Sequence, residues 1–129
     1  IGEWTFWDCN KVCISVIPEH VSKIGRLAFT CCEGIKALVF KNQLEVINDR
    51  AFSGCKNLER IVFPNNLREI SDFAFARCIN LKGINLPASL QKIGYRAFGN
   101  CESLLFVKYN SNPKVDSSAF MNCPISQEK

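Results

Sequence analysis

A spacing of 23 residues runs through this chain and limits what it can fold into. Six of the eight cysteines follow it, separated by 23, 23, 23, 23 and 22 residues: Cys9, Cys32, Cys55, Cys78, Cys101 and Cys123. Phenylalanines keep the same period at Phe6, Phe29, Phe52, Phe75, Phe98 and Phe120. A disulfide framework has no reason to space its cysteines evenly, whereas a repeated structural unit does. The sequence therefore predicts about five and a half copies of one repeat.

Each copy of the repeat combines a short strand with a turn. In the third copy, apolar residues stand at Leu58, Ile61 and Phe63, and the alternation predicts a strand with one buried face. Pro64 ends this strand because proline has no N–H to donate to a ladder. The serine and aspartate at positions 71–72 suit a helix start, so we expect a short helical turn through the following Ala-Phe pair.

Stacking is the way in which such units bury their apolar sides, because each copy covers the next. Strands of successive copies would then align roughly 4.8 Å apart in one curved parallel sheet, with helical turns on the opposite side. We therefore predict an α/β solenoid over residues 1–125 and a polar tail over residues 126–129. The first two residues align with Ile24 and Gly25, so the chain starts in mid-repeat, as a fragment of a longer array would.

The repeat resembles the BspA-like subclass of the leucine-rich-repeat superfamily, whose pattern is C-x-x-L-x-x-I-x-L-P-x-x-L-x-x-I-G-x-x-A-F-x-x-C. Residues 78–101, CINLKGINLPASLQKIGYRAFGNC, match this pattern almost throughout, and the resemblance covers nearly the whole chain. It implies a right-handed leucine-rich-repeat solenoid. It also implies a cell-surface or secreted protein, often an adhesin or another host- or matrix-binding protein, and it carries no catalytic motif.

The chemistry of the cysteine column leaves three interpretations open. Stacked copies would bring the cysteine Cα atoms to roughly 5 Å, which a disulfide can span, but the side chains would point in parallel. Buried free thiols, which behave as small apolar groups, are therefore the favoured interpretation. A zinc site needs four ligands, but no second cysteine pair matches the spacing of Cys9 and Cys13 and His20 is the single histidine, so we expect no metal. Cys13, outside the column, is the best candidate for an exposed thiol.

Enzymatic, nucleic-acid-binding and membrane-spanning functions find little support in the sequence. The net charge is +4, but the basic residues are scattered rather than clustered. No apolar run approaches the ~18 residues of a membrane span. His20 follows Pro18 in a predicted turn, and neither a phosphate-binding loop nor a carboxylate pair stands out. We therefore expect no enzyme activity, no cofactor, no nucleic-acid partner and no membrane insertion.

The outward positions of the predicted strands form the candidate partner-binding surface, on the concave face of the sheet. Its residues are Ile14, Val16, Val39, Arg60, Val62, Asn85, Phe106 and Lys108. Outward valines fit either sheet stability or a patch that a partner covers. Phe106 beside Arg60 and Lys108 has the composition of a binding hot spot. The sequence therefore favours a module that binds a protein or a glycan.

Two alternatives remain at this point. The solenoid could be a structural spacer whose faces bind nothing. It could also self-associate through the open N-terminal end of the stack, where Trp4, Phe6 and Trp7 would pack on a second copy.

Overall fold

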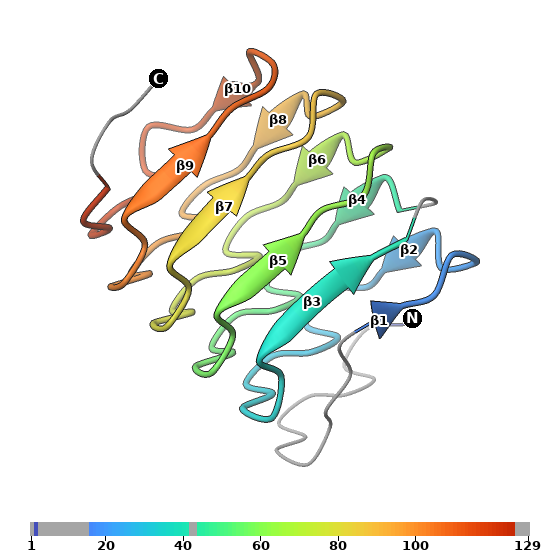
Figure 1. The fold of residues 1–129 in the computed structure, drawn as a ribbon, viewed down its shortest axis with the longest axis horizontal. Helices are drawn as coiled ribbons and strands as arrows, with labels where there is room; N and C mark the ends of the chain where they lie inside the picture. Colours follow the sequence, from blue (N-terminus) through green and yellow to red (C-terminus); the bar gives the residue numbers. More distant parts are fainter. Residues whose placement is uncertain (1, 3–15, 42–43, 126–129) are drawn as a thin grey trace.

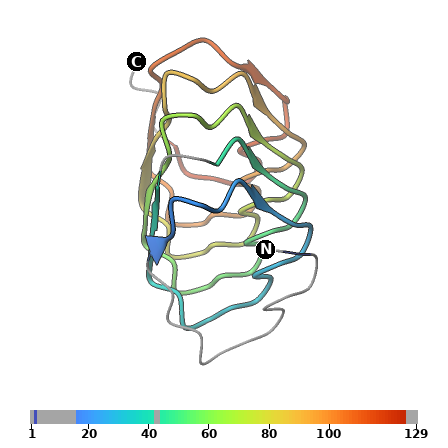
Figure 2. The ribbon, with the colours of Figure 1, turned by 90° about the vertical axis from the view of Figure 1, so that its right-hand side faces the viewer.

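The chain forms a stack of coils in a computed structural model that describes residues 2, 16–41 and 44–125 (Figure 1). On one side of the coils run β1 (Val16–Ile17), β3 (Ala37–Phe40), β5 (Arg60–Val62), β7 (Gly83–Asn85) and β9 (Phe106–Lys108). On a second side run β2 (Lys23–Ile24), β4 (Val46–Ile47), β6 (Glu69–Ile70), β8 (Lys92–Ile93) and β10 (Lys114–Val115). Figure 2 shows successive coils lying one above another with matching bends. Four residues named above, Ile14, Trp4, Phe6 and Trp7, and the tail at 126–129 lie outside the described residues.

All strand pairings of the described chain are parallel, and they keep the 23-residue register except between β8 and β10, where Lys92 pairs with Lys114. Ala37 pairs with Arg60 on the first side, and Ile24 pairs with Ile47 on the second. The prediction of a parallel-sheet solenoid is therefore confirmed, but the prediction of one sheet is wrong. The second side forms its own five-stranded ladder, β10-β8-β6-β4-β2, and the first side divides into β1-β3-β5 and β7-β9.

The division on the first side lies between β5 and β7, which still run side by side (Figure 1). Just ahead of these strands, the Lys82 N–H lies 3.5 Å from the Glu59 carbonyl oxygen. The equivalent bond from the Glu59 N–H to the Lys36 carbonyl measures 2.7 Å. The backbone hydrogen bond between the segments ahead of β5 and β7 is thus longer than its equivalent. The two strands still lie side by side in one surface.

The predicted helical turns are absent: the described residues contain no helix. In four of the five described turns, two residues that flank the Ala-Phe pair have the left-handed backbone conformation, and in the last turn Asn122 alone does. This conformation interrupts the run of right-handed residues that a helix needs. In the third copy these are Arg50, with φ 56°, and Gly54, with φ 73°. Phe73 and Arg77 repeat the arrangement in the next copy, with φ 57° and 60°.

Backbone hydrogen bonds explain why these turns keep a non-helical form. The Arg50, Phe52 and Gly54 N–H groups donate to carbonyls of the next coil at 3.0, 2.8 and 2.8 Å. The N–H groups between them bond within the turn, as Ala51 does to the Asn48 carbonyl at 3.1 Å. Alternate donors thus point along the solenoid axis, so the turns join the coils together, which an isolated helical turn would not do.

The core between the ladders consists of the apolar columns that the sequence predicted, and this prediction is confirmed. Phenylalanine rings form a continuous stack, with centroid separations of 5.1–5.3 Å and interplanar angles of 2–8°. Four of its members, Phe29, Phe52, Phe75 and Phe98, are completely buried. Offset stacking of aromatic rings contributes about 0.5–1.5 kcal/mol per pair beyond the burial of apolar area.

The cysteine column lies beside this stack, and its described members are free thiols. The Sγ atoms of Cys55, Cys78 and Cys101 each donate to the carbonyl of the phenylalanine 26 residues earlier, at 3.3, 3.3 and 3.1 Å. Burial raises the pKa of Cys78 to about 12 and raises that of Cys55 well above its ordinary value. The column is therefore a row of protonated donors that links coils. Cys13 lies outside the described residues, whereas Cys31 is partly exposed.

Candidate binding surface

The side of the solenoid that carries β1, β3, β5, β7 and β9 presents the candidate surface, called here the main sheet face. Strand alternation decides which side chains reach it, because neighbouring residues point to opposite sides of a strand. In β5, Ile61 is buried while Arg60 and Val62 are exposed. Among the predicted site residues, the structure exposes Val16, Arg60, Val62, Asn85, Phe106 and Lys108, and half-buries Val39.

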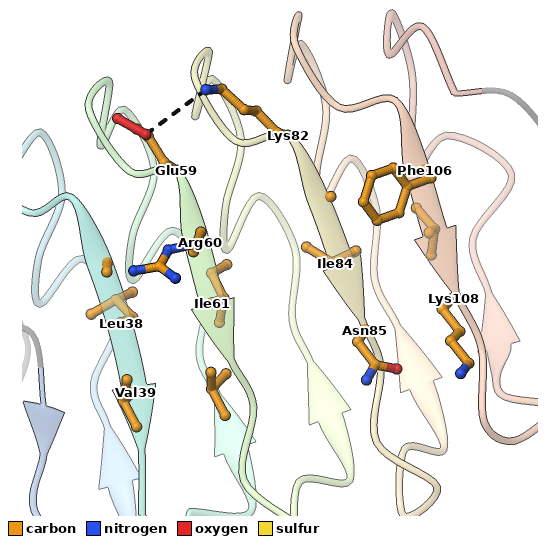
Figure 3. Close-up of a pocket in the computed structure, with 14 residues that line it drawn as sticks. Leu38, Val39, Glu59, Arg60, Ile61, Lys82, Ile84, Asn85, Phe106 and Lys108 are labelled. Carbon is orange, nitrogen blue, oxygen red and sulfur yellow. Dashed lines mark ion pairs between the residues drawn. The ribbon is translucent and has the colours of Figure 1, made fainter.

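The main sheet face is hollowed rather than flat. A cavity of about 870 Å³ is lined by residues of β3, β5, β7 and β9 and of the segments just ahead of them (Figure 3). All of the predicted site residues from Val39 onward line this cavity, so the structure brings them together. It also adds Gly83, Glu59 and Lys82, which the sequence reasoning did not select as site residues.

Phe106 is positioned by the glycine beside it. A Cβ atom on Gly83 would overlap the Cζ, Cε2 and Cε1 atoms of the Phe106 ring, so the ring occupies the space above the β7 backbone. Figure 3 shows the ring leaning from β9 towards β7. The ring remains 55% exposed despite this support. A glycine next to an aromatic residue in the same outward column was the available sequence signal for this arrangement.

An apolar row crosses β1, β3 and β5 on the same face, with β7 between it and the strand of Phe106. Val16 pairs with Val39, and Val39 pairs with Val62, so the three valines lie side by side in register. The outer two are 46% and 57% exposed. Valine favours strands, so the row stabilises the sheet, and it also leaves a continuous apolar strip open to contact.

The charges on the cavity are unbalanced in favour of cations. Glu59 and Lys82 form an exposed ion pair with an N–O distance of 3.9 Å, which contributes little stability (Figure 3). Arg60 and Lys108 have no ion-pair partner within the described part of the chain. Glu59 is the only carboxylate among the lining residues. The lining residues therefore carry a net positive charge.

The described residues offer few groups for metal binding or catalysis. Within residues 2, 16–41 and 44–125, no three His, Cys, Asp or Glu side chains are grouped closely enough to hold a metal ion. No helix that could cross a membrane is found over the same residues. His20 lies exposed in the turn after β1, where the sequence predicted it.

Comparison with known proteins identifies the repeat. The sequence profile of the BspA type leucine rich repeat region matches residues 1–126 in six copies. The chain belongs to the BspA-type leucine-rich-repeat family. Members of this repeat family are generally protein-interaction modules, and no match indicates a catalytic family. A search of curated proteins found no significant match.

Solved bacterial structures share this fold. A leucine-rich repeat protein from Eubacterium ventriosum superposes with a TM-score of 0.90 at 26% identity, over 99% of this chain and 35% of that one. One from Bacteroides ovatus gives 0.78 at 36% identity, over 84% and 28%. A leucine rich cell surface protein from Faecalibacterium prausnitzii gives 0.79 at 30% identity, over 88% and 32%. The chain spans about a third of the length of these proteins.

Proposed function

We propose that this BspA-type repeat module binds a protein partner through its main sheet face, as part of a surface or secreted protein. The observation that carries the proposal is the Phe106 ring, which is held over Gly83 at the wall of the cavity and is more than half exposed. Aromatic and arginine side chains dominate the binding energy of protein interfaces. The main sheet face carries one of each, because Phe106 and Arg60 both lie on it.

The physical design of the face supports binding. Its side chains project from hydrogen-bonded strands, so a partner meets a preorganised surface and little conformational entropy is lost on contact. The valine row supplies apolar area, and Arg60, Lys82 and Lys108 against Glu59 favour an acidic partner. An acidic polypeptide segment with apolar side chains fits both features.

A surface or secreted location is part of the proposal. Its support is the Faecalibacterium prausnitzii protein, described as a cell surface protein and 30% identical over most of this chain. An adhesin-like role, in which the module attaches its parent protein to a host or matrix protein, is the finer form of the same proposal.

The experiment selects ligands without assuming an identity for the partner. A phage-displayed random peptide library is panned against the immobilised protein, and the affinities of selected peptides are measured by isothermal titration calorimetry. Phe106→Ala and Arg60→Gln should each weaken binding by about tenfold or more. The matched controls Tyr95→Ala and Lys92→Gln, exposed on other sides of the coils, should leave it unchanged. Peptides that bind all four variants as tightly as the native chain would overturn the proposal.

The alternatives predict different results. A structural spacer would yield no peptide whose affinity depends on the main sheet face. A glycan-binding face would yield no such peptide but would retain oligosaccharides in a Phe106-dependent way. Self-association through Trp4, Phe6 and Trp7 would appear as concentration-dependent sedimentation of the native chain, lost in a Trp4→Ala/Trp7→Ala double variant.

A further inference from the structure

A second hollow lies on the turn side of the solenoid, and no residue lines both it and the main sheet face. This cleft has a volume of about 300 Å³ and spans three successive copies. Its cationic walls are Arg50, Arg77 and Arg96, its floor is Ser53, Ala76 and Gly99, and Phe73 and Asn100 complete it.

The repeat itself builds this cleft. Arg50, Phe73 and Arg96 occupy one left-handed position of three successive turns, and Arg77 and Asn100 occupy the other. Between these two rows stands the residue that follows each phenylalanine, which is small in three successive copies. Large side chains at the two left-handed positions therefore flank a row of small side chains. The 23-residue period repeats this arrangement from coil to coil.

The cleft has cationic walls and no carboxylate lining. Two acids lie nearby without lining the cleft: Asp49 Oδ2 pairs with Arg50 Nη1 at 2.8 Å, and Asp72 Oδ1 accepts from the Tyr95 N–H at 2.8 Å. Arg77 forms no ion pair with any described residue. Arg77 and Arg96 therefore have no carboxylate partner among the described residues, and the partner of Arg50, Asp49, does not line the cleft.

Aromatic rings lie beside two of the three guanidinium groups. The Arg50 Cζ atom lies 4.4 Å from the centroid of the Phe73 ring, and the Arg96 Cζ lies 5.1 Å from that of Tyr95. The two rings meet edge to face at 5.5 Å. Stacking leaves the in-plane N–H donors of a guanidinium group available to an acceptor, because the ring contacts only its flat face.

Arg96 carries a donor that lacks an acceptor. Its Nε atom is buried and has no hydrogen-bond partner in the described chain. A buried donor of a charged group without an acceptor is costly, so such atoms are rare in folded proteins. Arg96 lines the cleft, so a shift of its guanidinium group towards an anionic oxygen bound there would give this N–H an acceptor.

We propose that the turn-side cleft binds an oxyanion group, a phosphate or sulfate ester carried on a small polar ligand. Arg96 and Arg77 hold it by charge-assisted hydrogen bonds, and a guanidinium fork matches the oxygens of a tetrahedral anion. Ser53 and Asn100 add neutral polar groups beside the arginines. The site shares no lining residue with the cavity of the main sheet face.

The test titrates the intact chain with sodium sulfate, sodium phosphate, glucose 6-sulfate and glucose 6-phosphate, with sodium chloride as the ionic-strength control. The NMR signal of the Arg96 Nε–H reports occupancy directly. We expect a saturable shift with at least one ester, and the sulfate and phosphate arms identify which ester is preferred. The Arg96→Lys variant keeps the charge but removes Nε, and it should weaken binding about tenfold, as should Arg77→Gln.

The matched control is Arg68→Gln, which removes the same charge from an exposed arginine outside the cleft, one that pairs with Glu45 at 3.2 Å. This variant should bind the ester as the native chain does. Equal losses in Arg68→Gln and Arg77→Gln would show screening by net charge and overturn the proposal. Shifts that follow sodium chloride alone, or no saturable shift in the native chain, would overturn it as well. Circular dichroism of each variant confirms that the fold is retained.

Discussion

The Phe106 ring occupies the space that a side chain at Gly83 would need, although the two residues lie a full repeat apart in the sequence. The three atoms nearest to such a Cβ all belong to the ring, at the far end of the Phe106 side chain. The glycine therefore sets the position of the ring and contributes less to the stability of the strand.

Gly83→Ala should move the ring with little loss of stability. The new methyl group displaces the ring outward, while an alanine fits a strand at least as well as a glycine, so the free energy of unfolding should change by less than about 1 kcal/mol. The measurements are urea denaturation and the nuclear Overhauser contact between the Phe106 ring and the residue 83 Hα, which should disappear. In Gly94→Ala the new Cβ would meet the Asp72 backbone nitrogen at 2.9 Å, and this control should lose about 1–3 kcal/mol. A larger loss in Gly83→Ala than in Gly94→Ala would contradict this account.

The phenylalanine stack should be most sensitive at its centre. Phe75 is completely buried and stacks on both Phe52 and Phe98, so Phe75→Leu should lower the free energy of unfolding by about 1–3 kcal/mol. Phe120 is only partly buried and, among the described rings, stacks on Phe98 alone, so Phe120→Leu should cost clearly less. Urea unfolding followed by circular dichroism makes the comparison. Equal losses at the two positions would argue against a cooperative stack.

The left-handed turns predict an unusual order of substitutions at Gly54. Alanine and asparagine would each place a Cβ atom 3.1 Å from Cys31 Sγ, so the difference between the variants isolates the backbone. Asparagine tolerates a φ of 73° better than alanine does, and it already occupies the equivalent place at Asn100 and Asn122. We therefore expect Gly54→Asn to be more stable than Gly54→Ala by about 0.5–1 kcal/mol. Thermal unfolding of the two variants checks this order. A lower unfolding temperature for Gly54→Asn than for Gly54→Ala would contradict the prediction.

The buried thiols should make stability fall at alkaline pH. The folded-state pKa of Cys78 is about 12, above its ordinary value of 9.0, so between these values the unfolded chain releases a proton that the folded chain keeps. Stability is therefore fully present below pH 9 and decreases as the pH rises, by up to about 1.4 kcal/mol per unit for each such thiol.

Comparison with Cys78→Ala separates the thiol from other alkaline titrations. The variant is less stable at neutral pH because it leaves a cavity, but its stability should fall less steeply between pH 9 and 11. The readout is the urea midpoint at each pH. Parallel curves for the native chain and the variant would show that the Cys78 thiol ionises freely in the folded state.

The sequence alone determined the parallel stacking, the buried columns and the outward residues of the main strands. The 23-residue period equates each residue with its neighbour in the next coil, so the partners of Ile24 and Phe52 could be inferred before any coordinates. Apolar alternation then decided which side chains face the core, and it correctly placed Arg60 and Val62 outside. Val39 was assigned to the surface for the same reason, although its position between Val16 and Val62 leaves it half-buried.

Only the tertiary structure decided the form of the turns and the second ladder. The Ser-Asp pair at 71–72 is a local helix signal, but the N–H of Phe73 donates to the Tyr95 carbonyl of the next coil at 2.9 Å. That acceptor is supplied by a distant segment, so no local pattern announces it, and Phe73 takes a left-handed conformation to reach it. The position of the Phe106 ring over Gly83 and the turn-side cleft were also decided by the tertiary structure. Each depends on which side chains successive coils bring into contact.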